Sequence, residues 1–141
     1  DGVPRHLPGL HRARKMQSKA AKTGFEWDRS SEAMAKVDEE LCELKQAMHE
    51  GDRAAMEEEL GDLLFAVVNL ARMEGMQAEE TLHGAISKFE RRFRSLEKGL
   101  HEEARSIGDC SLDQLLELWA IAKRVTAGED TARDDGGSQG T

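Results

Sequence analysis

Apolar side chains recur along most of the chain with the three- and four-residue spacing of amphipathic α-helices. This spacing predicts helices over residues 7–23, 31–49, 52–74, 78–99 and 111–125. A glycine stands at or just past the end of each of the first four, as is common at helix C-termini. Both prolines precede residue 9 and aromatic residues make up only 4% of the chain, which disfavours a β-sheet fold. The expected fold class is all-α.

The same pattern sets the expected limits of the folded region. We expect one domain over residues 7–125, a helical bundle of four to five helices, because 141 residues are enough for a single hydrophobic core. Residues 1–6 and the polar, glycine-containing segment 126–141 are expected to be disordered. The chain begins with Asp1 instead of methionine, which leaves room for an upstream domain.

The predicted helix over residues 52–74 is apolar around nearly its whole circumference. From residue 60 to residue 71, only Gly61, Asp62 and Asn69 are not apolar. A helix of this kind must be buried on nearly all sides, and a chain of this length has few other elements to surround it. We therefore expect a homodimer in which this helix lies in a shared bundle core. Asn69 should have a hydrogen-bond partner in that core or in a pocket.

Charge and composition argue against several kinds of partner and location for this chain. The net charge of −8 and the pI of about 5.2 argue against nucleic acid as a main partner. No apolar run reaches the ~18 residues of a membrane span, and no signal peptide is recognised. Cys42 and Cys110 are expected to be free thiols in a reducing compartment, so the expected location is the cytoplasm.

Two acidic pairs are the most informative polar feature. Glu40 and Glu43 are three residues apart, as are Glu59 and Asp62, so each pair shares a helix face. Like charges at this spacing repel unless a cation or solvent separates them. Each pair flanks an apolar stripe, and antiparallel packing through the stripes would bring the pairs together. The stripe of the 31–49 helix is Val37, Leu41, Leu44 and Met48.

Oxygen ligands of this kind suit Mg²⁺ or Mn²⁺ better than Zn²⁺. The alternative is an ordinary solvated acidic face. Zinc has little support, because the five histidines are scattered and no Cys-x-x-Cys is present. A di-iron helical bundle would need two Glu-x-x-His motifs, and only Glu80–His83 exists.

Lys88 and Arg92 are four residues apart and border the apolar stripe of the 78–99 helix. Two cations on one helix face can bind a polyphosphate, although such a pair is more often part of a solvated surface. Trp119 and Lys123 have the same spacing on the last helix. A tryptophan there more often covers the core than stacks on a base.

The acidic residues resemble the signature of the MazG family of nucleoside triphosphate pyrophosphohydrolases. That signature is Glu-Glu-x-x-Glu, a spacer, then Glu-x-x-Asp, and it stands here as Glu39-Glu40-x-x-Glu43 and Glu59-x-x-Asp62. The resemblance runs from about residue 7 to residue 124 and is closest to the second, catalytic half of two-domain bacterial members. It includes residues 20–27, and its specific part is the stretch 57–70 followed by residues 88–93.

The resemblance implies an all-α dimer that converts a nucleoside triphosphate to the monophosphate and pyrophosphate. It implies Mg²⁺, with Mn²⁺ as a substitute, bound by Glu40, Glu43, Glu59 and Asp62. The implied substrate-binding residues are Lys36, Glu39, Glu58 and Asp62 at the nucleotide, Lys88 and Arg92 at the phosphates, and Trp119 and Lys123 closing on the nucleotide.

Glu39 is a candidate general base for the attacking water, because it adjoins the metal ligands without being needed as one. Two alternatives remain open at this point. One is a pyrimidine-specific enzyme that acts on dUTP or dCTP, since the shape of the pocket around Phe25 and Trp27 would decide base choice. The other is a non-catalytic helical interaction module.

Overall fold

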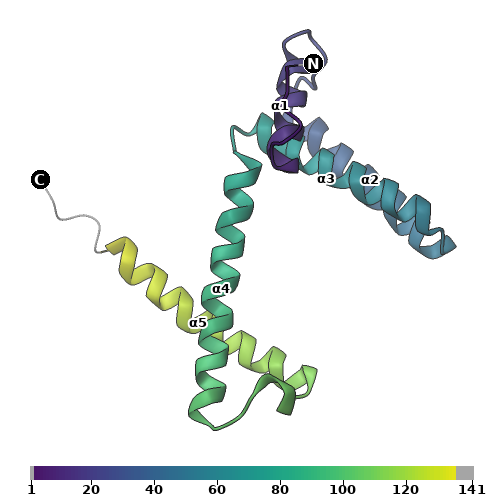
Figure 1. Cartoon of the computed structure of the whole chain (residues 1–141). Coiled ribbons are helices and arrows are strands. Elements are labelled where there is room, and N and C mark those ends of the chain that lie inside the picture. Colours follow the sequence, from purple (N-terminus) through teal and green to yellow (C-terminus); the bar gives the residue numbers. More distant parts are fainter. Residues whose placement is uncertain (1, 136–141) are drawn as a thin grey trace, which may run out of the picture. The chain divides into compact units, whose positions relative to one another are not determined.

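The computed structural model of the protein describes residues 2–135, and every regular element in this range is a helix (Figure 1). The all-α prediction is therefore confirmed. The elements are α1 (Gly9–Ala21), α2 (Ser30–Glu50), α3 (Arg53–Met73), α4 (Ala78–Glu102), the 3₁₀ helix η1 (Ile107–Asp109) and α5 (Leu112–Asp135). None of the described helices is both long and apolar enough to cross a membrane.

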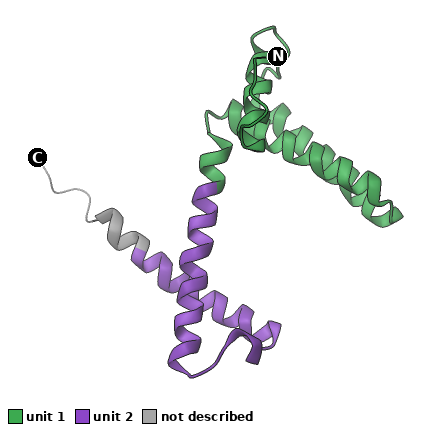
Figure 2. Ribbon diagram, in the orientation of Figure 1, with its two compact units in different colours: residues 1–82 green, residues 83–141 purple. Residues whose placement is uncertain are grey.

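The chain divides into two compact units, Asp1–Leu82 and His83–Thr141 (Figure 2). The first unit holds α1, α2 and α3, and the second holds most of α4 together with η1 and α5. The single domain over residues 7–125 stays a prediction.

A helical hairpin of α2 and α3 forms most of the first unit, and the two helices run side by side (Figure 1). Gly51 ends α2 with a left-handed backbone, φ 68°, which glycine adopts without steric cost. Asp52 then caps α3, because its Oδ1 accepts a hydrogen bond of 3.1 Å from the Ala55 N–H. The glycine expected just past the end of this helix is present, and together with the Asp52 cap it reverses the chain.

The buried face of α2 differs from its predicted apolar stripe. Ala33, Glu40 and Ala47 are its buried residues, whereas Leu41 and Met48 are exposed. Alanines allow close approach of two helix backbones, and this rotation of α2 places the Glu40 side chain inside the packed face. The tertiary packing therefore buries a carboxylate and leaves two large apolar side chains at the surface.

Helix α3 is only partly buried within the described part of one chain. Ala66 and Val68 are buried, but Leu60, Leu64 and Val67 are about half exposed. The all-round burial expected of this helix is not provided by one copy. The homodimer that would provide it stays a prediction.

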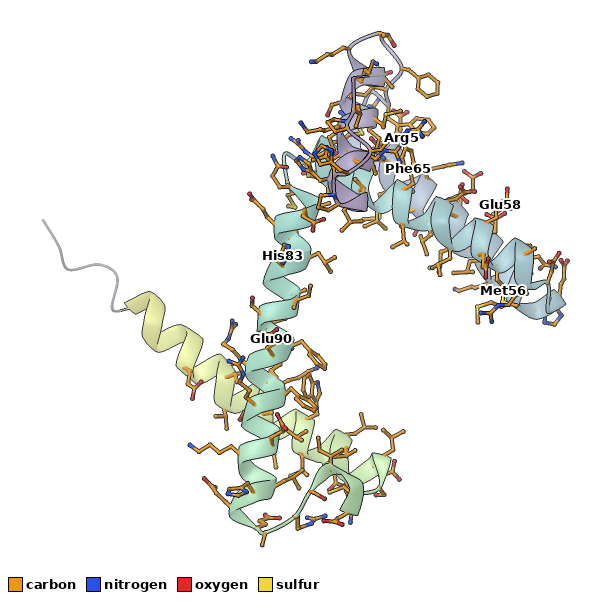
Figure 3. The ribbon with its side chains drawn as sticks, in the orientation of Figure 1. Arg5, Met56, Glu58, Phe65, His83 and Glu90 are labelled. Atoms are coloured by element: carbon orange, nitrogen blue, oxygen red, sulfur yellow. The ribbon has the colours of Figure 1, made fainter. Side chains whose placement is uncertain are left out.

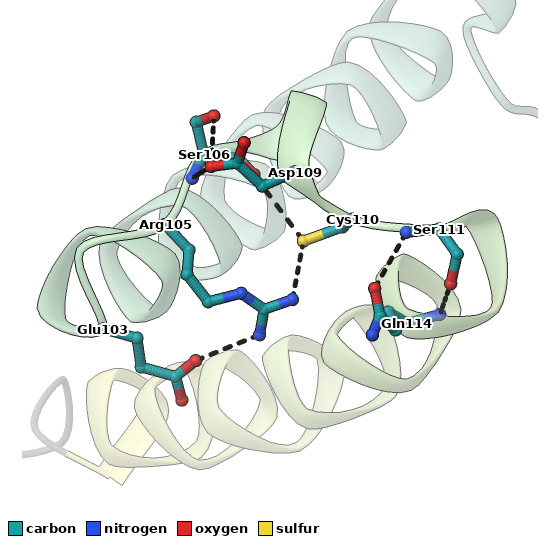
Figure 4. Close-up of polar contacts among 7 residues, drawn as sticks. All are labelled: Glu103, Arg105, Ser106, Asp109, Cys110, Ser111 and Gln114. Carbon is teal, nitrogen blue, oxygen red and sulfur yellow. Dashed lines mark hydrogen bonds and ion pairs between the residues drawn. The ribbon is translucent and has the colours of Figure 1, made fainter.

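The core of the second unit consists of Leu96 and Leu100 from α4 and Ala122 from α5. The connection between these helices is held by local hydrogen bonds (Figure 4). Ser111 and Gln114 form a capping box at the start of α5, because the Gln114 N–H donates to Ser111 Oγ at 3.2 Å and the Ser111 N–H donates to Gln114 Oε1 at 2.9 Å.

Helix α5 continues ten residues past its predicted end at 125, to Asp135. Thr126, the first residue of the expected tail, is buried and donates from Oγ1 to the Ala122 carbonyl at 2.9 Å. Residues 136–141, also expected to be disordered, lie outside the described residues.

Candidate functional site

A pocket of about 830 Å³ lies in the first unit, between α1, α2, α3 and the loop that joins α1 to α2. Its lining is largely apolar and includes a few charged side chains. The apolar lining includes Met16, Ala20, Phe25, Trp27, Phe65 and Ala66, and the charged lining includes Glu26, Lys36, Glu40 and Asp62. A pocket with apolar walls and a few convergent polar groups is typical of a small-molecule site.

Three of the four predicted metal ligands come together, and two of them, Glu40 and Asp62, line this pocket. One carboxylate oxygen each of Glu40, Glu59 and Asp62 lies within 4.8 Å of the other two. Glu40 comes from α2 and is only 8% exposed, while Glu59 and Asp62 come from successive turns of α3. An all-oxygen donor set of this kind can hold a hard divalent cation.

The electrostatics of the cluster reflect this crowding. Partial burial and a hydrogen bond with Glu40 raise the pKa of Glu59 above its ordinary value, and the charges of Glu43, Glu40 and Asp62 raise it further. The charge of Glu43, the fourth predicted ligand, therefore acts on Glu59. A cation at the cluster would relieve the repulsion among these carboxylates.

Lys36 supplies one positive charge beside the cluster. Its Nζ lies 3.0 Å from Glu40 Oε1 and 3.3 Å from Glu39 Oε1. Glu40 first, and then Glu39, raise the pKa of Lys36 above its ordinary value. The lysine thus holds the buried Glu40 and the exposed Glu39 in neighbouring positions.

Glu58 lies apart from the pocket lining. It is exposed on the N-terminal half of α3, whereas Phe65, which lines the pocket, stands further along the same helix (Figure 3). The remaining predicted site residues belong to the second unit and are described within it.

In the second unit, Lys88 and Lys123 are exposed and Arg92 is half-buried. The Nε atom of Arg92 has no hydrogen-bond partner among the described residues. Trp119 packs on Phe89 with ring centroids 5.2 Å apart, so it covers apolar side chains of α4.

Several polar residues of the pocket were not singled out from the sequence as site residues. The Gln17 Nε2 group of α1 donates a hydrogen bond of 2.9 Å to the backbone carbonyl of Phe65. Asn69 has the hydrogen-bond partner that its position predicted, because Arg72 donates to its Oδ1, and Arg72 also pairs with Glu26. Only Asn69, polar within an apolar run, gave a sequence signal.

Comparison with known proteins agrees with the acidic geometry. The model of the MazG nucleotide pyrophosphohydrolase domain matches residues 29–97, a segment that includes both acidic pairs. This part of the chain belongs to the MazG family. The family resemblance expected from the acidic motifs is thus confirmed, and Lys88 and Arg92 also lie within the MazG match.

Relatives extend the similarity beyond the matched segment. The chain is 42% identical over 126 residues to a nucleoside triphosphate pyrophosphohydrolase of Escherichia coli (strain K12), covering 88% of this chain and 48% of the relative. It is 37% identical over 117 residues to the nucleoside triphosphate pyrophosphohydrolase/pyrophosphatase MazG of Thermotoga maritima, covering 83% of this chain and 45% of the relative. The chain therefore spans about half the length of these two curated relatives.

Proposed function

We propose that this MazG domain hydrolyses nucleoside triphosphates between the α- and β-phosphates and releases the nucleoside monophosphate and pyrophosphate. The observation that carries the proposal is the group of Glu40, Glu59 and Asp62 oxygens, all within 4.8 Å, at a pocket of about 830 Å³. The names of the relatives from Escherichia coli and Thermotoga maritima support the same reaction.

We propose Mg²⁺ as the cofactor, with Mn²⁺ as a substitute. The donor set fits Mg²⁺, because Glu40, Glu59 and Asp62 offer only oxygen atoms as ligands. The charge of Glu43 also acts on Glu59, so this fourth carboxylate lies near the same cluster. A bound Mg²⁺ supplies positive charge against the polyphosphate and lowers the pKa of a bound water. These four carboxylates would hold it.

The chain's own side chains would position the remaining groups. Glu39 would accept the proton of the attacking water, and its contact with Lys36 supports a fixed carboxylate position. Asp62, which lines the pocket, would also contact the bound nucleotide. The further nucleotide contacts proposed from the family are Lys36 and Glu58 in the first unit, and Lys88, Arg92, Trp119 and Lys123 in the second.

We further propose that two copies of the chain associate and that the protein works in the cytoplasm. The exposed apolar side chains of α2 and α3 support association, because a monomer rarely leaves a large apolar patch in water. They are Met34, Leu41, Met48, Leu60, Leu64 and Val67. The cytoplasmic location is supported by two free cysteines, Cys42 and Cys110.

The decisive experiment measures pyrophosphate release from a panel of NTPs and dNTPs with and without Mg²⁺. We expect pyrophosphate release to depend on Mg²⁺, and we expect Glu59→Ala to lower kcat by about 100-fold or more. Replacing even a residue that only hydrogen-bonds to a metal ligand lowers activity or metal affinity by about 10–100-fold. Glu57→Ala, which removes an exposed carboxylate of α3, serves as the matched control and should keep full activity.

Each other outcome has a defined meaning. Turnover of dUTP or dCTP alone would favour the pyrimidine-specific enzyme. No release from any nucleotide, together with no effect of Mg²⁺ on thermal stability, would favour the interaction module. Glu39→Gln should lower turnover by about 100-fold or more if Glu39 is the base. Near-normal turnover with intact Mg²⁺ binding would remove Glu39 from that role.

A further inference from the structure

The pocket extends along α3 beyond the acidic cluster. Asp62 and Asn69 both line it, and they are seven residues apart, which corresponds to about 10.5 Å along a helix axis. A nucleotide places its base at a comparable distance from its α-phosphate. If the phosphates lie at the acidic residues, as the proposed function requires, the base reaches the part of the pocket around Asn69.

The orientation of the Asn69 amide is determined by its neighbour. Arg72 donates to Asn69 Oδ1 from Nε at 3.1 Å and from Nη2 at 2.9 Å. A guanidinium can only donate hydrogen bonds, so the atom facing it must be the oxygen. The Nδ2 group therefore points away from Arg72, and no described residue accepts a hydrogen bond from it.

Arg72 is itself held in place. Its Nη1 lies 2.8 Å from Glu26 Oε1, and its side chain is only 12% exposed. Glu26 belongs to the loop that lines the pocket. A short chain of polar contacts from this loop thus fixes the amide of Asn69 and leaves its Nδ2 group without a partner among the described residues.

Gln17 supplies the complementary group. Its Nε2 donates to the Phe65 carbonyl, which can only accept, so the identity of this nitrogen is also settled. The remaining Oε1 is buried and has no hydrogen-bond partner among the described residues, although Gln17 lines the pocket and is only 7% exposed. An unpaired buried acceptor costs free energy that a ligand N–H would recover.

The Gln17 amide lies beside the turn of α3 that runs from Phe65 to Asn69. The Phe65 carbonyl points along α3 toward the next turn, and Asn69 is the residue one turn further on. Both side chains line this pocket, and each keeps one group without a hydrogen-bond partner among the described residues, the donor Asn69 Nδ2 and the buried acceptor Gln17 Oε1. The apolar side chains of Phe65 and Ala66 line the same part of the pocket.

We propose that Gln17 and Asn69 bind the Watson–Crick edge of the nucleobase. Asn69 Nδ2 donates to a carbonyl oxygen or ring nitrogen of the base, and Gln17 Oε1 accepts from the adjacent N–H. The substrate class is a nucleoside triphosphate whose Watson–Crick edge is unmodified. A base methylated at that N–H leaves the Gln17 acceptor unpaired and is rejected. Arg72 acts as a positioning residue through Asn69.

The test compares UTP and GTP with N3-methyl-UTP and N1-methyl-GTP, which differ only at this N–H. We expect the wild type to favour the unmethylated nucleotides by about tenfold or more in kcat/KM, as for other sites that hydrogen-bond a substrate N–H. Asn69→Asp keeps the side-chain shape and the pairing with Arg72 but removes the donor. It should lower kcat/KM for UTP and GTP about tenfold or more.

Inorganic tripolyphosphate with Mg²⁺ is the matched ligand without a base. Its affinity, measured by calorimetry, should be the same in wild type and Asn69→Asp within about twofold. Gln46→Glu, an amide-to-acid change on the exposed face of α2, is the control for added charge and should change neither measurement. Arg72→Lys should raise KM for UTP and GTP while leaving tripolyphosphate binding unchanged.

Two results would overturn the assignment. One is equal wild-type turnover of methylated and unmethylated nucleotides, and the other is an equal loss of nucleotide and tripolyphosphate binding in Asn69→Asp. If the wild type hydrolyses no nucleotide, the proposed reaction fails, and the base site is tested separately by binding of UMP and GMP against ribose 5-phosphate. A preference for the two nucleotides that Asn69→Asp abolishes would support the base site without turnover.

Discussion

At the scale of single residues, the site depends on carboxylates that lie close enough to repel one another, one of which is buried. Glu40 is buried and contacts Lys36 at 3.0 Å, and it also raises the pKa of its neighbour Glu59. One lysine does not neutralise the four carboxylates that act on one another. The cluster is therefore expected to be the least stable part of the first unit without a cation and to be stabilised by binding one.

This argument gives a pH prediction for the protein without metal. Because the folded-state pKa of Glu59 is raised above its ordinary value of 4.5, the folded state binds a proton that the unfolded state has already lost in this window. The stability should therefore fall as the pH rises from 4.5 through the raised pKa. Thermal unfolding in EDTA across this range measures the effect, and saturating Mg²⁺ should reverse it.

Glu59→Gln provides the control, because it has no charge to titrate. The variant should show a weaker pH dependence in EDTA and a smaller increase in Tm with Mg²⁺. A wild-type Tm that does not respond to Mg²⁺ at any pH would contradict a cation site at Glu40, Glu59 and Asp62.

At the scale of elements, the α2–α3 hairpin positions the whole acidic cluster. The cluster takes Glu40 from one helix and Glu59 and Asp62 from the other, so it depends on the relative placement of both. The reversal at Gly51 and Asp52 joins them. The stability of this turn should therefore matter for metal binding as well as for folding.

Asp52→Ala removes the side-chain acceptor that caps α3. We expect the free energy of unfolding to fall by about 1 kcal/mol, the usual cost of losing a helix N-cap, because the Ala55 N–H then has no side-chain partner. Urea denaturation followed by circular dichroism measures the change. Asp52→Asn keeps an acceptor oxygen and should lie within a few tenths of a kcal/mol of the wild type.

A loss in Asp52→Asn as large as that in Asp52→Ala would show that the charge of Asp52, and not the cap hydrogen bond, stabilises the hairpin. The affinity for Mg²⁺, measured on the same two variants, then reports how far the turn controls the acidic cluster.

At the scale of the whole molecule, one chain leaves large apolar side chains in water. Leu60, Leu64 and Val67 share one face of α3 at helical spacing, and Met34 and Met48 are exposed on α2. Burying such a face stabilises a complex by the hydrophobic effect. The exposed stripes therefore support association of two copies through the hairpin.

Light scattering after size-exclusion chromatography should give a mass of twice the 15.7 kDa of one chain. Leu64→Glu places a charge on the exposed stripe of α3 and should shift the protein toward the monomer, since burying an unpaired charge is costly. Met76→Glu, at an exposed methionine outside the helices, should leave the mass unchanged. A monomeric wild type at micromolar concentration would exclude the proposed association.

Much of this architecture could be predicted locally. The bounds of α2 and α3, the glycine at residue 51 and the caps at Asp52 and Ser111 follow from neighbouring residues, and the structure has them within a few positions. The end of α5 could not be predicted in this way, because the polar composition after residue 125 favoured disorder. The structure continues the helix through this segment, and Thr126 is buried at its start and donates to the Ala122 carbonyl.

The sequence by itself determined the helices and the spacing of the acidic residues, because both depend on contacts within one or two turns. The tertiary structure decided which face of α2 is buried, and therefore that Glu40 is the buried carboxylate of the cluster. It also decided that Gln17 meets Phe65 across 48 residues, and that Arg72, held by Glu26, orients Asn69. These contacts depend on how each helix is rotated against its neighbours, and that rotation is set by packing between segments distant in sequence.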